Sequence, residues 1–217
     1  MEEIEIEKNV LDENDGIAQA NRKLLADNGI FAMNVIGSPG AGKTTLLEHV
    51  LPKLAGRIST AVIEGDLYTD NDARRIAAAG AEVVQIDTEG GCHLDAGMIS
   101  RKLQNIDLKT KDLLVIENVG NLICPAEFDL GESQRLVIIS LTEGDDKPEK
   151  YPLAFLKADM VALTKMDLAP YIKADAEKMK KQMTDIHPGL KIFDCSFRDD
   201  QYDDGGLADY ILSCVRR

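Results

Sequence analysis

The chain has 217 residues, of which 44% are hydrophobic and 29% charged, a composition typical of a single globular domain with a sizeable core. Its net charge of −13 opposes binding to nucleic-acid backbones, and an aromatic content of 5% without Trp provides no platform for stacking bases. No apolar run approaches the ~20 residues of a membrane-spanning helix and the acidic N-terminal segment is unlike a secretory signal, so we expect a cytoplasmic protein that binds neither membranes nor nucleic acids.

Residues 1–30 are expected to form an N-terminal helical extension, either packed on the domain or serving as a docking arm for a partner, because apolar residues are spaced among charges there. From residue 31 onward, short runs rich in Val, Ile and Leu alternate with longer helical patterns, which is typical of an α/β fold with a mostly parallel sheet. Strands are expected at 31–36, 59–64, 81–87, 112–118, 136–142, 160–165 and 191–196. Helices are expected at 43–54, 70–79, 94–104, 151–158, 173–186 and 206–215.

The segment GSPGAGKT, between the first strand and the first helix, fits the phosphate-loop pattern G-x-x-x-x-G-K-S/T. Its glycines let successive backbone N–H groups turn toward phosphates, and the helix N-terminus adds partial positive charge there. Lys43 is expected to reach the β- and γ-phosphates, and Thr44 to offer its hydroxyl to Mg²⁺. The residues expected to bind a nucleoside triphosphate are Gly37, Ser38, Pro39, Gly40, Ala41, Gly42, Lys43, Thr44 and Thr45. This motif predicts a three-layer P-loop NTPase fold with a mostly parallel sheet of about seven strands and helices on both faces.

The segment TKMD ends the sixth expected strand and is similar to the guanine-reading motif N-K-x-D of GTPases. A carboxylate at Asp167 can accept from guanine N1–H and its exocyclic amine, whereas adenine presents an acceptor at N1. Lys165 can lay its stem along the base, and Thr164 replaces the usual Asn, so that amide's contact is weakened or made by a hydroxyl. Ser196 and Phe197 stand where GTPases place the loop that meets guanine O6. GTP is therefore the predicted nucleotide, and residues 31–217 the predicted GTPase (G) domain.

The fourth expected strand ends in ENVG, where GTPases carry the D-x-x-G segment that responds to the γ-phosphate and supports magnesium. Glu117 is therefore a candidate magnesium ligand and catalytic group, together with Lys43 and Thr44. Asp66 follows the second expected strand and is a second candidate for magnesium or for the attacking water. Asn121 stands where a glutamine would position that water, so this role stays unassigned and slow, magnesium-dependent hydrolysis is expected.

The four cysteines are too few and too scattered for a disulfide scaffold. Cys92 and His93 are adjacent after the third expected strand, and Cys124 follows the fourth, at the ends where an α/β sheet binds ligands. Thiolate and imidazole suit zinc, nickel or copper. The spacing is not a zinc-finger pattern, so buried inert cysteines are the alternative interpretation. No role is assigned to Cys195 or Cys214.

The chain resembles the HypB family of hydrogenase maturation GTPases from about residue 31 to 197, in the segments GSPGAGKTT, EGD, GGCHLDAGMI, ENVGNLICPAEFDLGE, TEGDDKPEKYP and TKMDL. The resemblance implies a GTPase metallochaperone that assists nickel insertion into the large subunit of nickel–iron hydrogenase. It implies a Ni²⁺ or Zn²⁺ site at Cys92, His93 and Cys124, at the interface of a nucleotide-dependent or metal-dependent homodimer. It also implies that a HypA-type, zinc-containing nickel chaperone engages the N-terminal region.

Some HypB proteins carry an N-terminal cysteine motif or a His-rich stretch for nickel, but no Cys or His precedes His49 here, so neither function is carried over. The nearest alternative is the urease accessory GTPase family UreG, whose cysteine and histidine form one C-P-H motif, whereas Ala126 follows Cys124-Pro125 in this chain. A P-loop kinase for a small molecule would need neither the guanine motif nor the paired cysteines. A third alternative is a GTP-switched scaffold in which metal is incidental. Measuring the metal bound per subunit, with and without nucleotide, distinguishes these functional classes.

Overall fold

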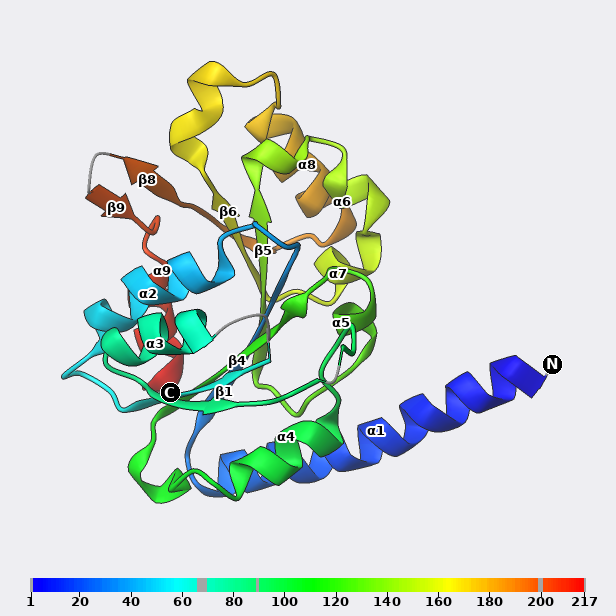
Figure 1. The fold of residues 1–217 in the computed structure, drawn as a ribbon. Coiled ribbons are helices and arrows are strands. Elements are labelled where there is room, and N and C mark those ends of the chain that lie inside the picture. Colours follow the sequence, from blue (N-terminus) through cyan, green and yellow to red (C-terminus); the bar gives the residue numbers. More distant parts are fainter. Residues whose placement is uncertain (1, 66–69, 89, 199–200, 217) are drawn as a thin grey trace.

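A computed structural model describes residues 2–65, 70–88, 90–198 and 201–216, with the side chains of 9–65, 72–88, 90–198 and 201–216. The chain begins with the long helix α1 (Glu2–Asp27) and continues into a seven-stranded sheet (Figure 1). The strands of this sheet are β1 (Phe31–Gly37), β2 (Thr60–Glu64), β3 (Glu82–Gln85), β4 (Leu113–Gly120), β5 (Gln134–Ser140), β6 (Met160–Thr164) and β7 (Lys191–Asp194). A separate antiparallel pair is formed by β8 (Ser196–Arg198) and β9 (Gln201–Asp203).

The remaining helices alternate with the strands along the chain. They are α2 (Lys43–Leu54), α3 (Asp70–Ala78), α4 (Ala96–Leu103), α5 (Cys124–Glu127), α6 (Lys147–Lys150), α7 (Pro152–Leu156), α8 (Ala176–Ile186) and α9 (Leu207–Val215). Three 3₁₀ segments join them within the described residues, namely η1 (Leu108–Thr110), η2 (Leu141–Glu143) and η3 (Met166–Tyr171). None of the helices described here combines the length and the apolar character that a bilayer-spanning segment requires.

The strand order is β3-β2-β4-β1-β5-β6-β7, and every neighbouring pair in this sheet is parallel. β1 lies at the centre, between β4 and β5, and the strand order changes direction there. In open α/β sheets, ligands bind outside the carboxyl ends of the strands at such a switch point. The phosphate loop leaves β1 at this place, so the topology puts the predicted nucleotide site at the switch point.

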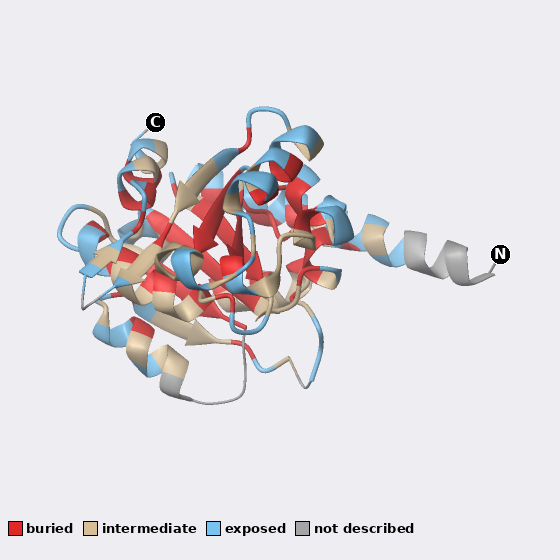
Figure 2. Cartoon of the chain, turned by 90° about the horizontal axis from the view of Figure 1, so that it is seen from above, coloured by how far each residue is buried: buried red, intermediate tan, exposed pale blue. Residues whose placement is uncertain are grey.

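Helices cover both faces of the sheet and bury its five inner strands, whereas the edge strands β3 and β7 are only partly buried (Figure 2). One face packs against α2, α3 and α9, and the other face packs against α1 and α4 at one end and α5, α7 and α8 at the other. This burial explains the continuous runs of Val, Ile and Leu, because a strand covered on both faces has no polar side. The expected three-layer α/β architecture, with helices on both faces of a seven-stranded parallel sheet, is confirmed.

The expected N-terminal helix is present as α1, which lies beside α4 along one side of the molecule (Figure 1). Asn14, Ala18, Asn21 and Leu25 are spaced by three or four residues, so they share one helix face. All four are buried, and Leu25 joins the core cluster beneath α4. α1 is therefore packed on the domain along this face, while the division into domains at residue 30 stays a prediction.

Two helices begin later than expected, because an aspartate caps each of them. The helix expected from residue 94 begins at Ala96, where the Asp95 carboxylate accepts a hydrogen bond from the Met98 N–H. The helix expected from residue 173 begins at Ala176, after a similar cap by Asp175. An N-cap residue keeps a non-helical backbone, so apolar residues before it do not belong to the helix.

The expected strands at 136–142 and 191–196 have different ends in the structure. β5 stops at Ser140, whose side chain caps the 3₁₀ segment η2 by accepting from the Thr142 N–H. β7 stops at Asp194, and the residues after Cys195 turn away as the β8–β9 hairpin. The hairpin, the 3₁₀ segments and the one-turn helices α5 and α6 were not predicted, because elements this short do not show a period.

Candidate functional site

The phosphate loop joins β1 to α2 at the carboxyl edge of the sheet. Gly40 (φ 76°) and Gly42 (φ 97°) adopt left-handed backbone conformations, which glycine takes without steric penalty. Gly42 immediately precedes Lys43, the first residue of α2, so the loop leads directly into a helix N-terminus. Backbone N–H groups and the helix dipole favour an anion at this position.

A pocket of about 570 Å³, a size suited to a nucleotide, opens beside this loop. Its lining comprises Gly40, Gly42, Lys43, Thr44, Thr45, Asp72, Arg75, Lys165, Asp167, Leu168 and Phe197. Most of these residues belong to the two motifs predicted to bind the phosphates and the guanine, so the fold brings both motifs to one cavity. Ala41 and Thr164 are fully buried behind it, while Ser38 and Pro39 line a neighbouring hollow on the side of Gly120.

The guanine-side motif is braced against the phosphate loop by two side chains. The Thr164 hydroxyl donates to the Ala41 carbonyl at 2.7 Å, and the Lys165 ammonium donates to the Gly40 carbonyl at 2.9 Å. Lys165 has a φ of 59°, a left-handed conformation that among the described residues is otherwise confined to glycines. The hydroxyl at 164 is therefore used to hold the phosphate loop, a role that the sequence left open.

Asp167 is fixed at the mouth of the pocket by the β8 segment. One of its carboxylate oxygens accepts the Phe197 N–H at 3.0 Å, which ties the base-reading motif to the loop expected at guanine O6. Phe197 lines the pocket, and its neighbour Ser196 begins β8 at the same place. Behind Phe197, the His49 and Tyr202 rings complete an aromatic group, with centroid distances of 5.6 and 4.8 Å to Phe197.

The predicted magnesium ligands Thr44 and Glu117 are in contact. The Thr44 hydroxyl donates to a Glu117 carboxylate oxygen at 2.9 Å, and Glu117 is fully buried at the end of β4. Glu64, also fully buried, pairs in register with Glu117 from the adjacent strand β2. These oxygen atoms are the hard donors that Mg²⁺ prefers, so the residues present fit this ion. Asp66, the other predicted ligand, lies outside the described residues.

The sequence did not identify Arg75, which enters the pocket from α3. Its guanidinium donates to the Glu48 carboxylate at 2.7 Å, to Asp72 at 3.0 Å and to the Thr45 hydroxyl at 3.3 Å. The ion pair with Glu48 raises the pKa of Arg75, so the side chain keeps its positive charge beside the phosphate loop. No motif marks an arginine on this helix, and only the packing of α3 against α2 brings it to the pocket.

The metal-binding hypothesis concerns Cys92, His93 and Cys124, and the fold brings them together. One ligand atom from each residue lies within 4.8 Å of the others, and the Cys92 sulfur is 3.4 Å from His93 Nδ1. Burial lowers the pKa of His93, which favours the neutral imidazole that binds metals. Hydrogen bonding to Cys124, followed by burial, raises the pKa of the Cys92 thiol. Two thiols and one imidazole fit nickel or zinc.

The other two cysteines lie apart from this group. Cys195 is fully buried, its sulfur bonds to the Phe193 and Asp204 carbonyls at 3.6 Å, and burial raises its pKa to about 12. Cys214, on α9, bonds to the Gln134 side chain. Cys195 is buried among backbone carbonyls and is not part of the Cys92–His93–Cys124 group, which supports leaving it out of the site.

The Cys92–His93 loop is joined to the end of β4, which carries the predicted magnesium ligand Glu117, by one buried side chain. Asn118 directly follows Glu117, and its carbonyl oxygen accepts the N–H of Leu94, the residue after His93, at 3.1 Å. The same oxygen accepts the Val119 N–H at 2.9 Å. The end of β4 and the histidine-bearing loop therefore share a hydrogen-bond acceptor.

Asn121 provides a second connection, between the two segments that carry the candidate metal ligands. Its amide donates to the Cys92 carbonyl at 3.3 Å and accepts the Ile123 N–H, directly before Cys124, at 3.0 Å. Its backbone bridges to Gly37 at the start of the phosphate loop. The side chain that stands in the position of a water-positioning glutamine is thus engaged with the metal-ligand loops.

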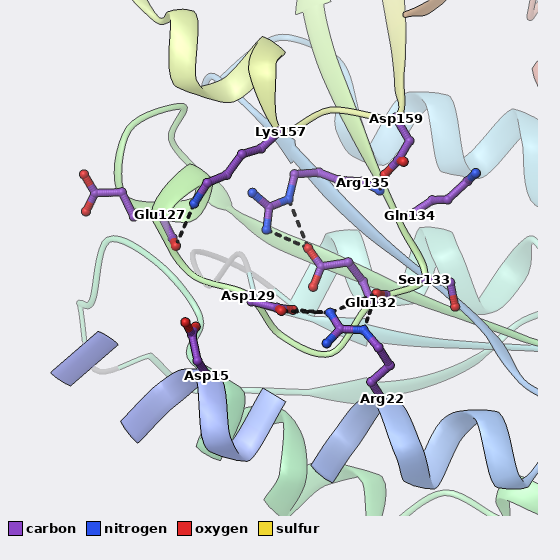
Figure 3. A pocket seen from close by; sticks show the side chains of 10 residues that line it. All are labelled: Asp15, Arg22, Glu127, Asp129, Glu132, Ser133, Gln134, Arg135, Lys157 and Asp159. Atoms are coloured by element: carbon purple, nitrogen blue, oxygen red, sulfur yellow. Dashed lines mark hydrogen bonds and ion pairs between the residues drawn. The ribbon is translucent and has the colours of Figure 1, made fainter. Parts of the chain in front are cut away.

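A second hollow, of about 470 Å³, lies between α1 and the segment that leads into β5 (Figure 3). Its three basic side chains already have partners: Arg22 bonds to Asp129 at 2.7 Å, Arg135 bonds to Glu132 at 2.6 Å, and the Lys157 ammonium donates to the Glu127 backbone carbonyl. Because these three cations are engaged in contacts within the protein, we assign no ligand to this hollow.

Comparison with known proteins gives consistent results. Residues 31–194 match the CobW/HypB/UreG nucleotide-binding domain. The chain is 46% identical over 189 residues to the hydrogenase maturation factor HypB of Escherichia coli K12, covering 87% of this chain but only 65% of that protein. It is similar to the crystal structure of HypB from Archaeoglobus fulgidus (TM-score 0.88, 38% identity, covering 94% and 100% of the two chains). It is also similar to HypB from Helicobacter pylori in complex with nickel (TM-score 0.87, 35% identity, covering 94% and 95%).

Proposed function

This chain belongs to the HypB hydrogenase maturation factors of the CobW/HypB/UreG family, and from that premise we propose that it is a GTP-hydrolysing metallochaperone that assists nickel insertion into nickel–iron hydrogenase. The observation that carries the proposal is the cluster of Cys92, His93 and Cys124, whose ligand atoms lie within 4.8 Å of one another, and whose loop is joined through Asn121 to the start of the phosphate loop. The identity to HypB proteins favours this function over the urease-type alternative. A metabolic kinase would not need a thiol–imidazole cluster at this place.

GTP binding follows from the two ends of the pocket. The phosphates bind over the N-terminus of α2, where Lys43 faces the β- and γ-phosphates. Asp167, held by the Phe197 N–H, accepts from guanine N1–H and its exocyclic amine. Lys165 covers the base with its aliphatic stem while its ammonium stays on the Gly40 carbonyl.

Hydrolysis depends on the residues around the γ-phosphate. Thr44 and Glu117 would hold Mg²⁺, which supplies charge neutralisation for the phosphoryl oxygens. Asp66 is a further candidate for this role. Asn121 is already bonded to the Cys92 carbonyl and the Ile123 N–H, so it is not oriented to position water. Slow intrinsic turnover is the expected result.

Metal binding is proposed to be coupled to dimerisation. Cys92, His93 and Cys124 provide one ligand fewer than a tetrahedral site needs. Two copies related by a two-fold axis would bring six such groups together. Because metal binding would then favour the dimer, linkage requires that the dimer favour metal binding equally. Asn118 and Asn121 connect these loops to the γ-phosphate segment, which gives GTP a structural route to this interface.

The proposed partners are a HypA-type nickel chaperone, at the N-terminal region, and the hydrogenase large subunit. Because this chain covers 65% of the length of the E. coli relative, activities of the remaining third of that protein are not transferred to it. Nucleic acids and membranes are not among the proposed partners, since the net charge of −13 repels phosphate backbones and anionic lipids.

Sedimentation with a GTP analogue or GDP, each with and without Ni²⁺ or Zn²⁺, tests the proposal together with metal bound per subunit. We expect the dimer with GTP analogue and metal, and a loss of both dimer and bound metal in Cys92→Ala and Cys124→Ala. Cys214→Ala, which removes a thiol outside the cluster, is the matched control. Unchanged mass in every condition, or full metal binding by both cluster variants, would refute the coupled site.

A further inference from the structure

Two buried asparagines of α1 hold the backbone of Ala96, the first residue of α4, at the point where the loop that carries Cys92 and His93 ends. Asn14 and Asn21 lie two turns apart on one face of α1 and are 6% and 2% exposed. The N–H of Ala96, three residues after His93, donates to the Asn14 side-chain oxygen at 2.9 Å. The Ala96 carbonyl accepts from the Asn21 amide at 2.8 Å. Both backbone groups of one residue are therefore taken by side chains of α1.

The same two amides hold the segment that follows Cys124. Asn14 donates to the Asp129 carbonyl at 2.8 Å, and Asn21 donates to the Leu130 carbonyl at 3.1 Å. Each asparagine thus bridges Ala96 to one of two successive carbonyls. Each asparagine bonds to both segments, so α1 holds side by side two segments that are far apart in the sequence.

The contact between α1 and this second loop is unusually close. Gly131 has a φ of 92°, and a Cβ added to it would lie 2.6 Å from the Ala18 carbonyl oxygen and 2.7 Å from the Asn21 Cβ. Arg22 adds a hydrogen bond to the Asp129 carboxylate at 2.7 Å (Figure 3). The loop therefore lies directly on the backbone of α1, and an alanine at position 131 would push it away.

The hydrogen bonds that Asn14 and Asn21 make to Ala96 and to the carbonyls of Asp129 and Leu130 are called the clamp below. This clamp is connected to the candidate metal ligand His93 through one ring stack. The His93 ring lies on the Phe128 ring, with centroids 4.0 Å apart and planes inclined by 25°. Phe128 directly precedes Asp129, which Asn14 holds, and His93 lies three residues before the clamped Ala96. α1 borders this stack, since Asn14, with Ile17 and Val10, lines a hollow of about 350 Å³ with His93 and Phe128.

We propose that Asn14 and Asn21 are positioning residues for the metal site, which fix the Cys92–His93 loop and the Cys124 loop in the relative position that brings their ligand atoms together. The inference rests on the proposed metal-binding function. It extends the site to helix α1, which contains none of the three proposed ligands. Mutation of groups that orient metal ligands through hydrogen bonds typically lowers metal affinity about 10- to 100-fold. It follows that a partner that moves α1 off this face weakens metal binding.

The first test measures the positions of the loops without metal. Diamide takes two electrons and two protons from Cys92 and Cys124 as their sulfurs join, and the rate of this disulfide, followed by peptide mapping, reports how often the two thiols meet. We expect Asn14→Ala to slow it about fivefold or more in the metal-free protein, since it removes both bridges made by that amide. Asn28→Ala, which removes only a local bond to the Leu24 carbonyl, is the control and should oxidise at the parent rate.

The second variant perturbs the clamp without changing α1. Gly131→Ala should slow the disulfide as well, whereas Gly189→Ala should not, although its φ of 91° imposes the same backbone strain, because its surroundings are open. This pair keeps the proposal testable if Asn14→Ala does not fold. Folding is checked by circular dichroism, and a folded Asn14→Ala or Gly131→Ala that oxidises at the parent rate overturns the proposal.

The final measurement is the Ni²⁺ affinity of the same variants, by competition with a chromophoric chelator. We expect Asn14→Ala and Gly131→Ala to bind Ni²⁺ about tenfold more weakly or worse, and the two controls to match the parent. Parent affinity in the folded clamp variants would overturn the positioning role. If Cys92→Ala leaves Ni²⁺ binding intact, the metal function fails instead, while the disulfide rates still decide whether α1 holds the two loops.

Discussion

Replacing Asp167 with Asn tests the assignment of the nucleotide with little change to the protein. The substitution keeps the shape of the side chain, and the Asn carbonyl oxygen can still accept the Phe197 N–H that Asp167 accepts at 3.0 Å. The β8 segment should therefore keep its place on the pocket. The second carboxylate oxygen becomes an NH₂ group, which directs a donor at the two donors of guanine.

The magnitude follows from the bonds that change. Losing a hydrogen bond to a charged acceptor removes about 1.5–3 kcal/mol, and leaving a buried donor unsatisfied adds about 1–3 kcal/mol. Their sum is at least about 2.5 kcal/mol, which corresponds to a loss of GTP affinity of about 70-fold or more. Xanthine carries a carbonyl in place of the exocyclic amine, so xanthosine triphosphate should bind the variant more tightly than it binds the parent.

Competition of GTP and xanthosine triphosphate against a fluorescent GDP analogue measures both affinities. Asp185→Asn is the matched control, because this aspartate lies on the exposed side of α8 and pairs with Lys181 away from the pocket lining. It should leave both affinities unchanged. An Asp167→Asn variant with the parent's preference for GTP over xanthosine triphosphate would remove Asp167 from the base site.

Three further outcomes are expected. Lys43→Ala removes the charge proposed to face the β- and γ-phosphates, so phosphate release from GTP should fall about 100-fold or more, and a parent rate would contradict its assignment. Thr44→Val keeps the side-chain shape but deletes the proposed ligand oxygen, so the stimulation of hydrolysis in a Mg²⁺ titration should be lost while nucleotide binding persists. Ni²⁺ affinity should rise with pH by up to about tenfold per unit for each thiol proton displaced, and one of these is the proton that hydrogen bonding to Cys124 and burial hold on Cys92, whose pKa is raised. The lowered pKa of His93 keeps the imidazole neutral, so a flat affinity from about pH 6.5 to 8.5 in competition titrations would contradict the thiol ligand.

The sequence was most informative where function requires a local pattern. The phosphate loop needs glycines at fixed spacing before a helix, so Gly40 and Gly42 could be recognised without a structure. The buried strands could be recognised from their apolar runs. Cys92 and Cys124 were harder, because only the sheet topology shows that the ends of β3 and β4 bring them together.

Contacts between a side chain and a segment that is distant in the sequence left no sequence signal. Arg75 reaches the pocket because α3 packs on α2, and Asn14 reaches Ala96 because α1 packs on α4. The apolar spacing of α1 predicts a helix that packs on the domain, but an asparagine within such a helix is equally compatible with a solvent-facing position. The distinction depends on which loop lies opposite, and that is a property of the tertiary structure.

The braces from Thr164 to the Ala41 carbonyl and from Lys165 to the Gly40 carbonyl have a consequence for the kinetics of binding. They join the proposed base-binding and phosphate-binding parts of the pocket to each other, so GDP and GTP should meet the same prearranged surface. Neither ligand has to order these loops, and both should associate at the ordinary rate of a rigid site. Discrimination between GDP and GTP then depends on the γ-phosphate end of the pocket, where Glu117 and Asn118 adjoin the loop of Cys92 and His93. The two nucleotides should therefore differ in their dissociation rates.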